Sequence, residues 1–97
     1  MIIRPEAEAD LADAQDWYER QQPGLGAEFL LCVEEVFARL NRTPEMYEEV
    51  YRGVRRALTR RFPYAVYYRV EGDEVVVLGS RGWATTLLAS VRRRPRL

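Results

Sequence analysis

Residues 51–79, YRGVRRALTRRFPYAVYYRVEGDEVVVLG, decide the fold of the chain. Pro63–Val70 is dense in aromatic and β-branched residues, and Glu74–Leu78 is an apolar run of strand length. Both patterns are typical of β-strands. Between them, Glu71-Gly72-Asp73 has turn chemistry, because a glycine adopts the positive φ of a tight hairpin at little cost. With Val54–Leu58 as a third strand, the segment predicts an antiparallel meander.

The first half of the chain has the apolar spacing of two helices. The first predicted helix runs from about Pro5 to Gln22, and the second runs from about Gly26 to Asn41. Their expected buried stripes are Ala7, Leu11, Ala14, Trp17 and Tyr18 in the first helix and Phe29, Val33, Val36, Phe37 and Leu40 in the second. Because the link over residues 23–26 is short, the two helices should pack together as an antiparallel hairpin.

The expected fold class is α+β, in one domain over residues 1–97. Met1–Arg4 predicts a short N-terminal strand, which Pro5 ends. A meander alone is marginally stable in water, so we expect the helix hairpin to cover one face of a twisted antiparallel sheet. The expected core contacts join two sets of side chains, Phe29, Val33, Val36 and Phe37 from the second helix and Val66, Tyr68, Val76 and Leu78 from the sheet.

Two further segments have no strand pattern. Residues 45–50 are expected to form a loop. Beyond Leu78 the strand pattern ends, and we expect a short helix or an unstructured tail. Such a helix would present the apolar residues Trp83, Leu87, Leu88 and Val91, and it would be followed by the basic residues Arg92, Arg93, Arg94 and Arg96.

The composition excludes several classes of protein. An apolar fraction of 47% and a charged fraction of 31% are those of a folded soluble domain. No apolar run approaches the ~20 residues that span a bilayer, and the N-terminus lacks a signal-peptide pattern, so we expect a cytoplasmic protein that does not enter a membrane. One cysteine, Cys32, cannot form an internal disulfide, and without histidine there is no cluster of soft metal ligands. We therefore expect no metal and no cofactor.

The net charge of zero hides a separation of acidic and basic residues along the chain. Residues 1–50 hold 12 acidic residues and 4 arginines, a formal charge of −8, whereas residues 51–97 hold 3 acidic residues and 11 arginines, a charge of +8. There is no lysine. A general preference for arginine would explain the missing lysine but not the separation. The separation predicts that one side of the domain binds an anionic ligand or partner.

Five arginines are the candidates for contacting a target or a phosphate group, because the guanidinium group offers planar, bidentate donors. They are Arg55, Arg56, Arg60, Arg61 and Arg81. The four charges between residues 55 and 61 repel one another, and we expect few acidic residues close enough in the fold to offset them. A bound anion would offset that repulsion.

Three tyrosines in the middle strand are candidates for stacking on a base. Strand alternation places Tyr64 and Tyr68 on one face and Tyr67 on the other. One of these faces must cover the helix hairpin, and we expect Tyr64 and Tyr68 to pack in the core. Tyr67 is then the candidate stacking residue.

Taken in order, these residues resemble the RelE/ParE superfamily, the toxins of type II toxin–antitoxin systems. The resemblance covers about residues 1–79, and its strongest block is the last part of that range. The matching residues are Ala7, Asp10-Leu11, Trp17-Tyr18-Glu19, Gly24-Leu25-Gly26, Phe29-Leu30, Pro44, Val54-Arg55-Arg56, Arg61-Phe62-Pro63-Tyr64, Tyr67-Tyr68 and Glu74–Leu78.

The resemblance implies a growth-inhibiting toxin that a cognate antitoxin neutralises in a hetero-oligomer. It leaves two targets open, DNA gyrase in the ParE branch and the ribosome with its mRNA in the RelE branch. Residues 80–97 depart from the family pattern, because they contain no histidine and no tyrosine follows Tyr68. In the nuclease branch, that segment supplies catalytic groups.

These departures bear on the choice between three functions. Cleavage of mRNA by a ribosome-dependent interferase needs a general base, and arginine is a poor one because its pKa is above 12. Inhibition of DNA gyrase by a ParE-like toxin needs a recognition surface and no base, so it tolerates the missing histidine. A member that retains only antitoxin binding is the third alternative. The residues favour the gyrase branch.

Overall fold

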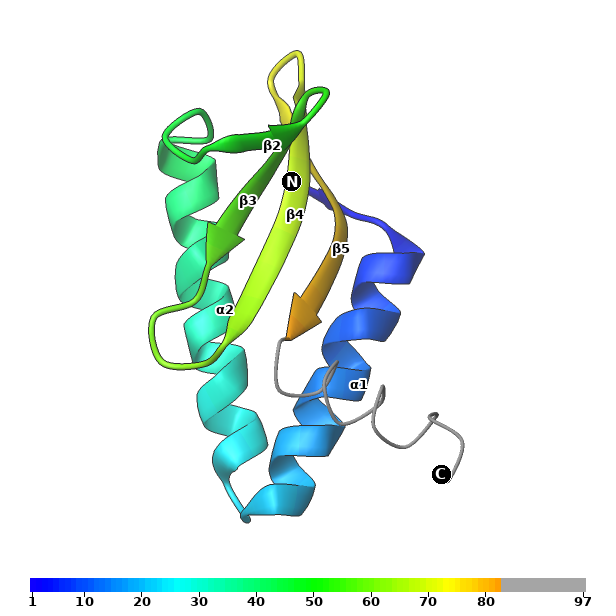
Figure 1. Ribbon diagram of the computed structural model, residues 1–97, viewed down its shortest axis with the longest axis vertical. Coiled ribbons are helices and arrows are strands. Elements are labelled where there is room, and N and C mark those ends of the chain that lie inside the picture. The colour runs from blue at the N-terminus through cyan, green and yellow to red at the C-terminus, as the bar shows by residue number, and fades with distance from the viewer. Residues whose placement is uncertain (83–97) are drawn as a thin grey trace, which may run out of the picture.

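The computed structural model describes residues 1–82 and shows two helices packed on one face of a five-stranded sheet (Figure 1). The elements in chain order are β1 (Ile2–Ile3), α1 (Pro5–Gln21), α2 (Leu25–Arg42), β2 (Glu49–Tyr51), β3 (Val54–Leu58), β4 (Tyr64–Glu71) and β5 (Glu74–Gly82). The order of strands across the sheet is β1-β5-β4-β3-β2. The α+β fold predicted from the sequence is confirmed. The helix or tail predicted from Trp83 onward lies outside the described residues.

The sheet is mixed, because β1 pairs parallel with β5. Ile2 lies opposite Val76 and Ile3 opposite Val77, whereas every other neighbouring pair of strands is antiparallel. The expectation of an antiparallel sheet therefore holds for β2–β5 and is wrong for β1. The helix hairpin and most of the meander separate β1 from β5 along the chain, so no tight turn imposes an antiparallel pairing.

The segment expected to be a loop, residues 45–50, contributes to the short edge strand β2. Glu49 lies opposite Arg55 and Tyr51 opposite Val54, with a bulge between the two pairs. All three residues of β2 are exposed. A strand without a buried face has no apolar alternation, so its sequence carried no strand signal.

A second bulge, between β4 and β5, changes which residues of β5 face the helices. Tyr67 lies opposite Gly79, but Tyr68 lies opposite Val77. One residue of β5 thus has no opposite residue on β4, and the alternation of β5 side chains between the two faces of the sheet shifts by one position. Val75 and Val77 join the core cluster against the helices, whereas the predicted Val76 is buried but lies outside that cluster and Leu78 is half-buried. The strand also continues to Gly82 and does not end at Leu78.

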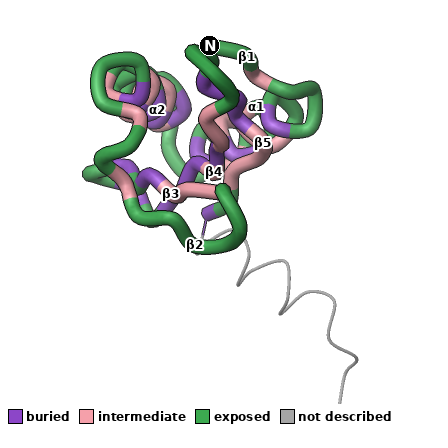
Figure 2. Tube along the Cα trace, turned by 90° about the horizontal axis from the view of Figure 1, so that it is seen from above, coloured by how far each residue is buried: buried purple, intermediate pink, exposed green. Residues whose placement is uncertain are grey.

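The core consists of two clusters between the helices and the sheet. In Figure 2, the buried positions lie mainly where α1, α2 and strands β3–β5 face one another. One cluster contains Ala7, Val36, Leu40, Ala57, Val66, Tyr68, Val75 and Val77. The other contains Ala14, Tyr18, Phe29, Val33, Phe62 and Tyr64. Phe37, expected deep in the core, is half-buried and packs against both clusters.

The link between the helices is held by one carboxylate. Glu19 Oε2 accepts a hydrogen bond from Gly24 N–H and Glu19 Oε1 accepts one from Gly26 N–H, each at 3.0 Å. Gly24 has a φ of 88°, a conformation that favours glycine. At Gly26 a Cβ atom would lie 2.9 Å from the Gln15 carbonyl oxygen, so a glycine there lets α2 approach α1 closely.

Candidate functional site

The helices leave one face of the sheet uncovered, and strand register fixes which side chains stand on it. Arg56 lies opposite Tyr67, Leu58 opposite Ala65, and Arg81 opposite Ala65 on the other side. Because paired residues share a face and the face alternates along a strand, these residues and Arg69 point away from the helices. We call the set Arg56, Leu58, Tyr67, Arg69 and Arg81 the open face; Ala65 stands on the same side but is buried.

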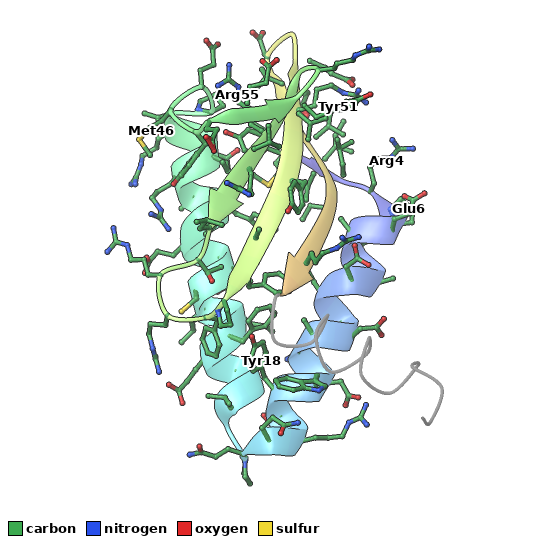
Figure 3. The ribbon with its side chains drawn as sticks, viewed as in Figure 1. Arg4, Glu6, Tyr18, Met46, Tyr51 and Arg55 are labelled. Atoms are coloured by element: carbon green, nitrogen blue, oxygen red, sulfur yellow. The ribbon has the colours of Figure 1, made fainter. Side chains whose placement is uncertain are left out.

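The structure divides the five candidate arginines into three groups. Arg56 and Arg81 stand on the open face. Arg55 points the other way, toward the loop that follows α2 (Figure 3). Its Nη1 donates to the Tyr47 carbonyl oxygen at 2.6 Å and to that of Glu45 at 3.3 Å, so Arg55 ties this loop to β3.

Arg60 and Arg61 form the third group, in the connection between β3 and β4. Arg60 Nε lies 3.6 Å from Glu35 Oε1, and Arg61 Nη2 lies 2.8 Å from Glu28 Oε1. The expectation that these arginines lack nearby acids is wrong, since α2 belongs to the acidic half of the chain and the fold places it beside them. Both pairs are exposed, and exposed ion pairs contribute little to stability because water screens them.

The arginines of the open face differ in their partners. Arg56 Nη2 lies 3.2 Å from Glu48 Oε1, and Arg69 Nε lies 2.9 Å from Glu71 Oε2. Arg81 is exposed and makes no ion pair with any residue in the range 1–82. Within that range, Arg81 is therefore the open-face guanidinium most available to an outside anion.

A depression beside Arg81 is lined by residues from four elements. They are Asp10 of α1, Tyr51 of β2, Tyr67 of β4, and Gly79, Ser80 and Arg81 of β5. Tyr51 is 66% exposed, and Figure 3 shows it near the end of β2. The Arg52 guanidinium carbon lies 5.7 Å from the centre of the Tyr51 ring. The depression thus combines aromatic rings with positive charge.

One wall of the depression is a hydrogen-bond network that joins α1 to the end of β5. Asp10 Oδ2 accepts a hydrogen bond from Ser80 N–H at 3.1 Å. The Tyr64 hydroxyl is hydrogen-bonded to Ser80 Oγ and donates to the Asp10 carbonyl oxygen at 3.4 Å. Because β1 ends at Ile3, it does not reach this part of β5, and the Asp10 carboxylate takes the place of a neighbouring strand there.

Tyr64 and Tyr68 are buried and Tyr67 is on the open face, as strand alternation predicts. The Tyr68 hydroxyl donates to the Pro44 carbonyl oxygen, which holds the end of α2 against the sheet. Asp10, Tyr51, Gly79 and Ser80 were not predicted as site residues. They come from three elements, α1, β2 and β5, and no local pattern marks those elements as neighbours.

The buried Tyr64 hydroxyl should make the stability of the protein depend on alkaline pH. Burial raises the pKa of Tyr64 to about 12, although the hydrogen bond to Ser80 partly offsets this rise. An unfolded tyrosine ionises near pH 10. Between pH 10 and 12 the unfolded chain loses a proton that the native state keeps, so the free energy of unfolding should fall as pH rises through this window.

Denaturant titrations from pH 9 to 12 test this expectation, with Tyr64→Phe as the matched variant. The variant keeps the ring and removes the proton, so its free energy of unfolding should fall less steeply over the window. Tyr18 and Tyr68, whose pKa values burial also raises, contribute equally to both proteins. Identical slopes for the two proteins would contradict the assignment.

The helix hairpin packed on the sheet is the fold that the resemblance to the RelE/ParE superfamily implies. A family model for the ParE toxin of the type II toxin–antitoxin system, parDE, matches residues 1–80. The chain therefore belongs to the ParE toxin family.

The fold of a solved structure agrees with this assignment. The structure described as "Chromosomal ParDE TA system from P. aeruginosa" superposes with a TM-score of 0.62 and is 21% identical, over 84% of this chain and 95% of that chain. At this identity, the likeness shows the fold. A search of curated proteins finds no match.

No helix within residues 1–82 is long and apolar enough to cross a membrane, and no three histidine, cysteine or acidic side chains in that range form a metal site.

Proposed function

We propose that the chain is a toxin that inhibits DNA gyrase by binding to it, with the open face as the target-binding surface. The observation that carries this proposal is the chemistry of that face. It presents Arg56, Arg69, Arg81 and the Tyr67 ring, a combination that suits recognition of an anionic surface. Inhibition by binding requires no proton transfer.

The surroundings of the open face support binding more than RNA cleavage. Attack by a ribose 2′-hydroxyl group needs a general base within hydrogen-bond reach. The chain has no histidine. The carboxylates beside the open-face arginines, Glu48 and Glu71, are held in ion pairs with Arg56 and Arg69.

We also propose that a cognate antitoxin binds the chain in a hetero-oligomer and neutralises it. The strand β2 ends the sheet, and an edge strand can accept a further strand from a partner. Exposed apolar side chains, Met46, Val50 and Tyr51, lie on or next to β2. At the other end of the sheet, beyond β1, Asp10 accepts the Ser80 N–H. Two other expectations from the sequence stay predictions: a single domain over residues 1–97, and a cytoplasmic location.

Two assays on the purified protein separate the possible targets. Supercoiling of relaxed plasmid DNA by gyrase should fall in the presence of the toxin and recover when its antitoxin, sought among the products of the neighbouring genes, is added. Translation-coupled cleavage of mRNA should not occur. Cleavage without loss of supercoiling would replace gyrase by the ribosome, and inactivity in both assays with antitoxin binding intact would indicate a member that retains only antitoxin binding.

A further inference from the structure

The end of β5, which carries Arg81, lies beyond the reach of β1. The Arg4 N–H donates to the Val77 carbonyl oxygen at 3.1 Å, and the chain then turns into α1 at Pro5. Beyond Val77, β5 therefore pairs with a strand on one side only, that of β4. The end of a strand that has few hydrogen bonds opens locally at a small cost in free energy. The position of this end thus depends on whatever else holds it.

The Asp10 side chain holds the end of β5 on the side that β1 does not reach. Asp10 Oδ2 accepts the Ser80 N–H at 3.1 Å. The Asp10 carbonyl oxygen accepts a hydrogen bond from the Tyr64 hydroxyl at 3.4 Å, and the same hydroxyl is hydrogen-bonded to Ser80 Oγ. Gly79 leaves room for the carboxylate, because a Cβ atom there would lie only 3.3 Å from Asp10 Oδ2. Helix α1 thus holds Ser80 by its backbone and, through Tyr64, by its side chain.

This anchor stands next to an arginine whose place is set by the backbone. Arg81 follows Ser80 directly, is exposed, and lines the same depression as Asp10. Its guanidinium group forms no ion pair with a carboxylate in the described part of the chain. The backbone of β5 therefore determines where this guanidinium group stands on the open face.

We propose that Asp10 is a positioning residue for target binding, which holds the end of β5 so that Arg81 meets an anionic group of the target. The inference rests on the proposed function, in that the open face binds gyrase. It adds that an acidic residue of α1, which does not belong to the open face, determines how well a basic residue of that face binds.

Positioning and charge predict opposite effects of removing the Asp10 carboxylate. A negative charge in the depression weakens the field that attracts an anionic target, so its removal would strengthen binding if charge alone mattered. If Asp10 positions Arg81, its removal weakens binding, because a displaced guanidinium group forms longer and poorly aligned hydrogen bonds.

Gyrase supercoiling assays with the purified full chain test the proposal as a double-mutant cycle. Asp10→Ala should raise the concentration needed for half-inhibition on the order of fivefold, within the range of coupling between residues of one network. In an Arg81→Gln background, Asp10→Ala should change it by less than about twofold, because the contact that Asp10 positions is already lost. In an Arg56→Gln background the fivefold loss should persist, since Arg56 stands on β3.

Two further variants separate the hydrogen bond from the charge. Asp10→Asn keeps a side-chain oxygen that accepts the Ser80 N–H and removes the charge, so it should inhibit at least as well as the wild type. Gly79→Ala keeps the charge and crowds the carboxylate, so it should weaken inhibition as Asp10→Ala does. It also replaces Asp10→Ala in the cycle if that variant does not fold, which thermal melting establishes.

Amide hydrogen exchange provides a measurement that does not involve gyrase. The Ser80 amide should exchange faster in Asp10→Ala than in the wild type, because it loses its acceptor. In Asp10→Asn its exchange should stay close to that of the wild type.

Three results would overturn the inference and leave the proposed function intact. They are equal losses of inhibition from Asp10→Ala in the Arg81→Gln and Arg56→Gln backgrounds, stronger inhibition by Asp10→Ala, and unchanged exchange of the Ser80 amide in Asp10→Ala. Equal losses would indicate a general effect on the fold, which acts in every background. A wild-type chain without effect on gyrase would overturn the proposed function, and the inference would fall with it.

Discussion

Replacing Phe29 by alanine should lower the free energy of unfolding by about 3–5 kcal/mol, the range for deleting a buried phenylalanine. Phe29 is fully buried on α2. Its ring centre lies 5.0 Å from that of Tyr18, 5.5 Å from that of Phe62 and 4.7 Å from that of Tyr64. Removing the ring would therefore leave a cavity among aromatic side chains from α1, β4 and the loop before β4.

The matched control lies two positions further along the same helix. Leu31 is 65% exposed, so Leu31→Ala should change the free energy of unfolding by less than about 0.5 kcal/mol. Urea titrations of the two variants and the wild type provide the comparison. If Phe29→Ala and Leu31→Ala have the same midpoint, the aromatic cluster is not a core.

The second large effect concerns the open-face arginines. Replacing Arg56 and Arg81 together by glutamine should abolish growth inhibition and raise the toxin concentration needed for half-inhibition of gyrase by about 100-fold or more. Each charged hydrogen bond to a target contributes about 1.5–3 kcal/mol, and two would be lost. Thermal stability should change little, because the ion pair between Arg56 and Glu48 is exposed and Arg81 has no acidic partner in the described part of the chain.

Two further double variants make this result interpretable. Arg60→Gln with Arg61→Gln removes the arginines that stand beside Glu35 and Glu28, and we expect a smaller loss of inhibition, because those acids already offset part of the charge. Arg20→Gln with Arg42→Gln makes the same change of net charge on the helices and should leave inhibition unchanged. If the Arg60 and Arg61 variant loses more activity than the open-face variant, the target contacts the β3–β4 loop and not the open face.

The helices could be predicted to within a residue or two at each end. Pro5 marks the first position of α1, and Gly24, with its positive φ, marks the turn to α2, because their backbone requirements are local. The apolar run of β5 could not be placed in register. Val75, Val76, Val77 and Leu78 are all apolar, so no alternation showed which of them face the helices, and the bulge opposite Tyr67 decided it.

In the candidate site, too, some features could be predicted from the sequence and others could not. Alternation along β4 correctly separated Tyr67 from Tyr64 and Tyr68, because a strand has a period of two wherever one face is buried. The partners of the arginines depend on tertiary structure and could not be predicted. Glu28 meets Arg61 across 33 positions of the sequence. The sequence likewise gave no sign that Asp10 would lie beside Ser80, 70 positions away.

The Asp10 carboxylate also bears on self-association of the molecule through the edge of the sheet. An exposed run of unpaired backbone amides is a template on which a second chain can add a strand, and repeated addition leads to fibres. Beyond Val77, where β1 stops, β5 would offer the Ser80 amide to such a strand. A negatively charged side chain already occupies the Ser80 amide, so an incoming strand would have to displace it and bury its charge. One helical side chain thus occupies the backbone amide that an added strand would need at this edge.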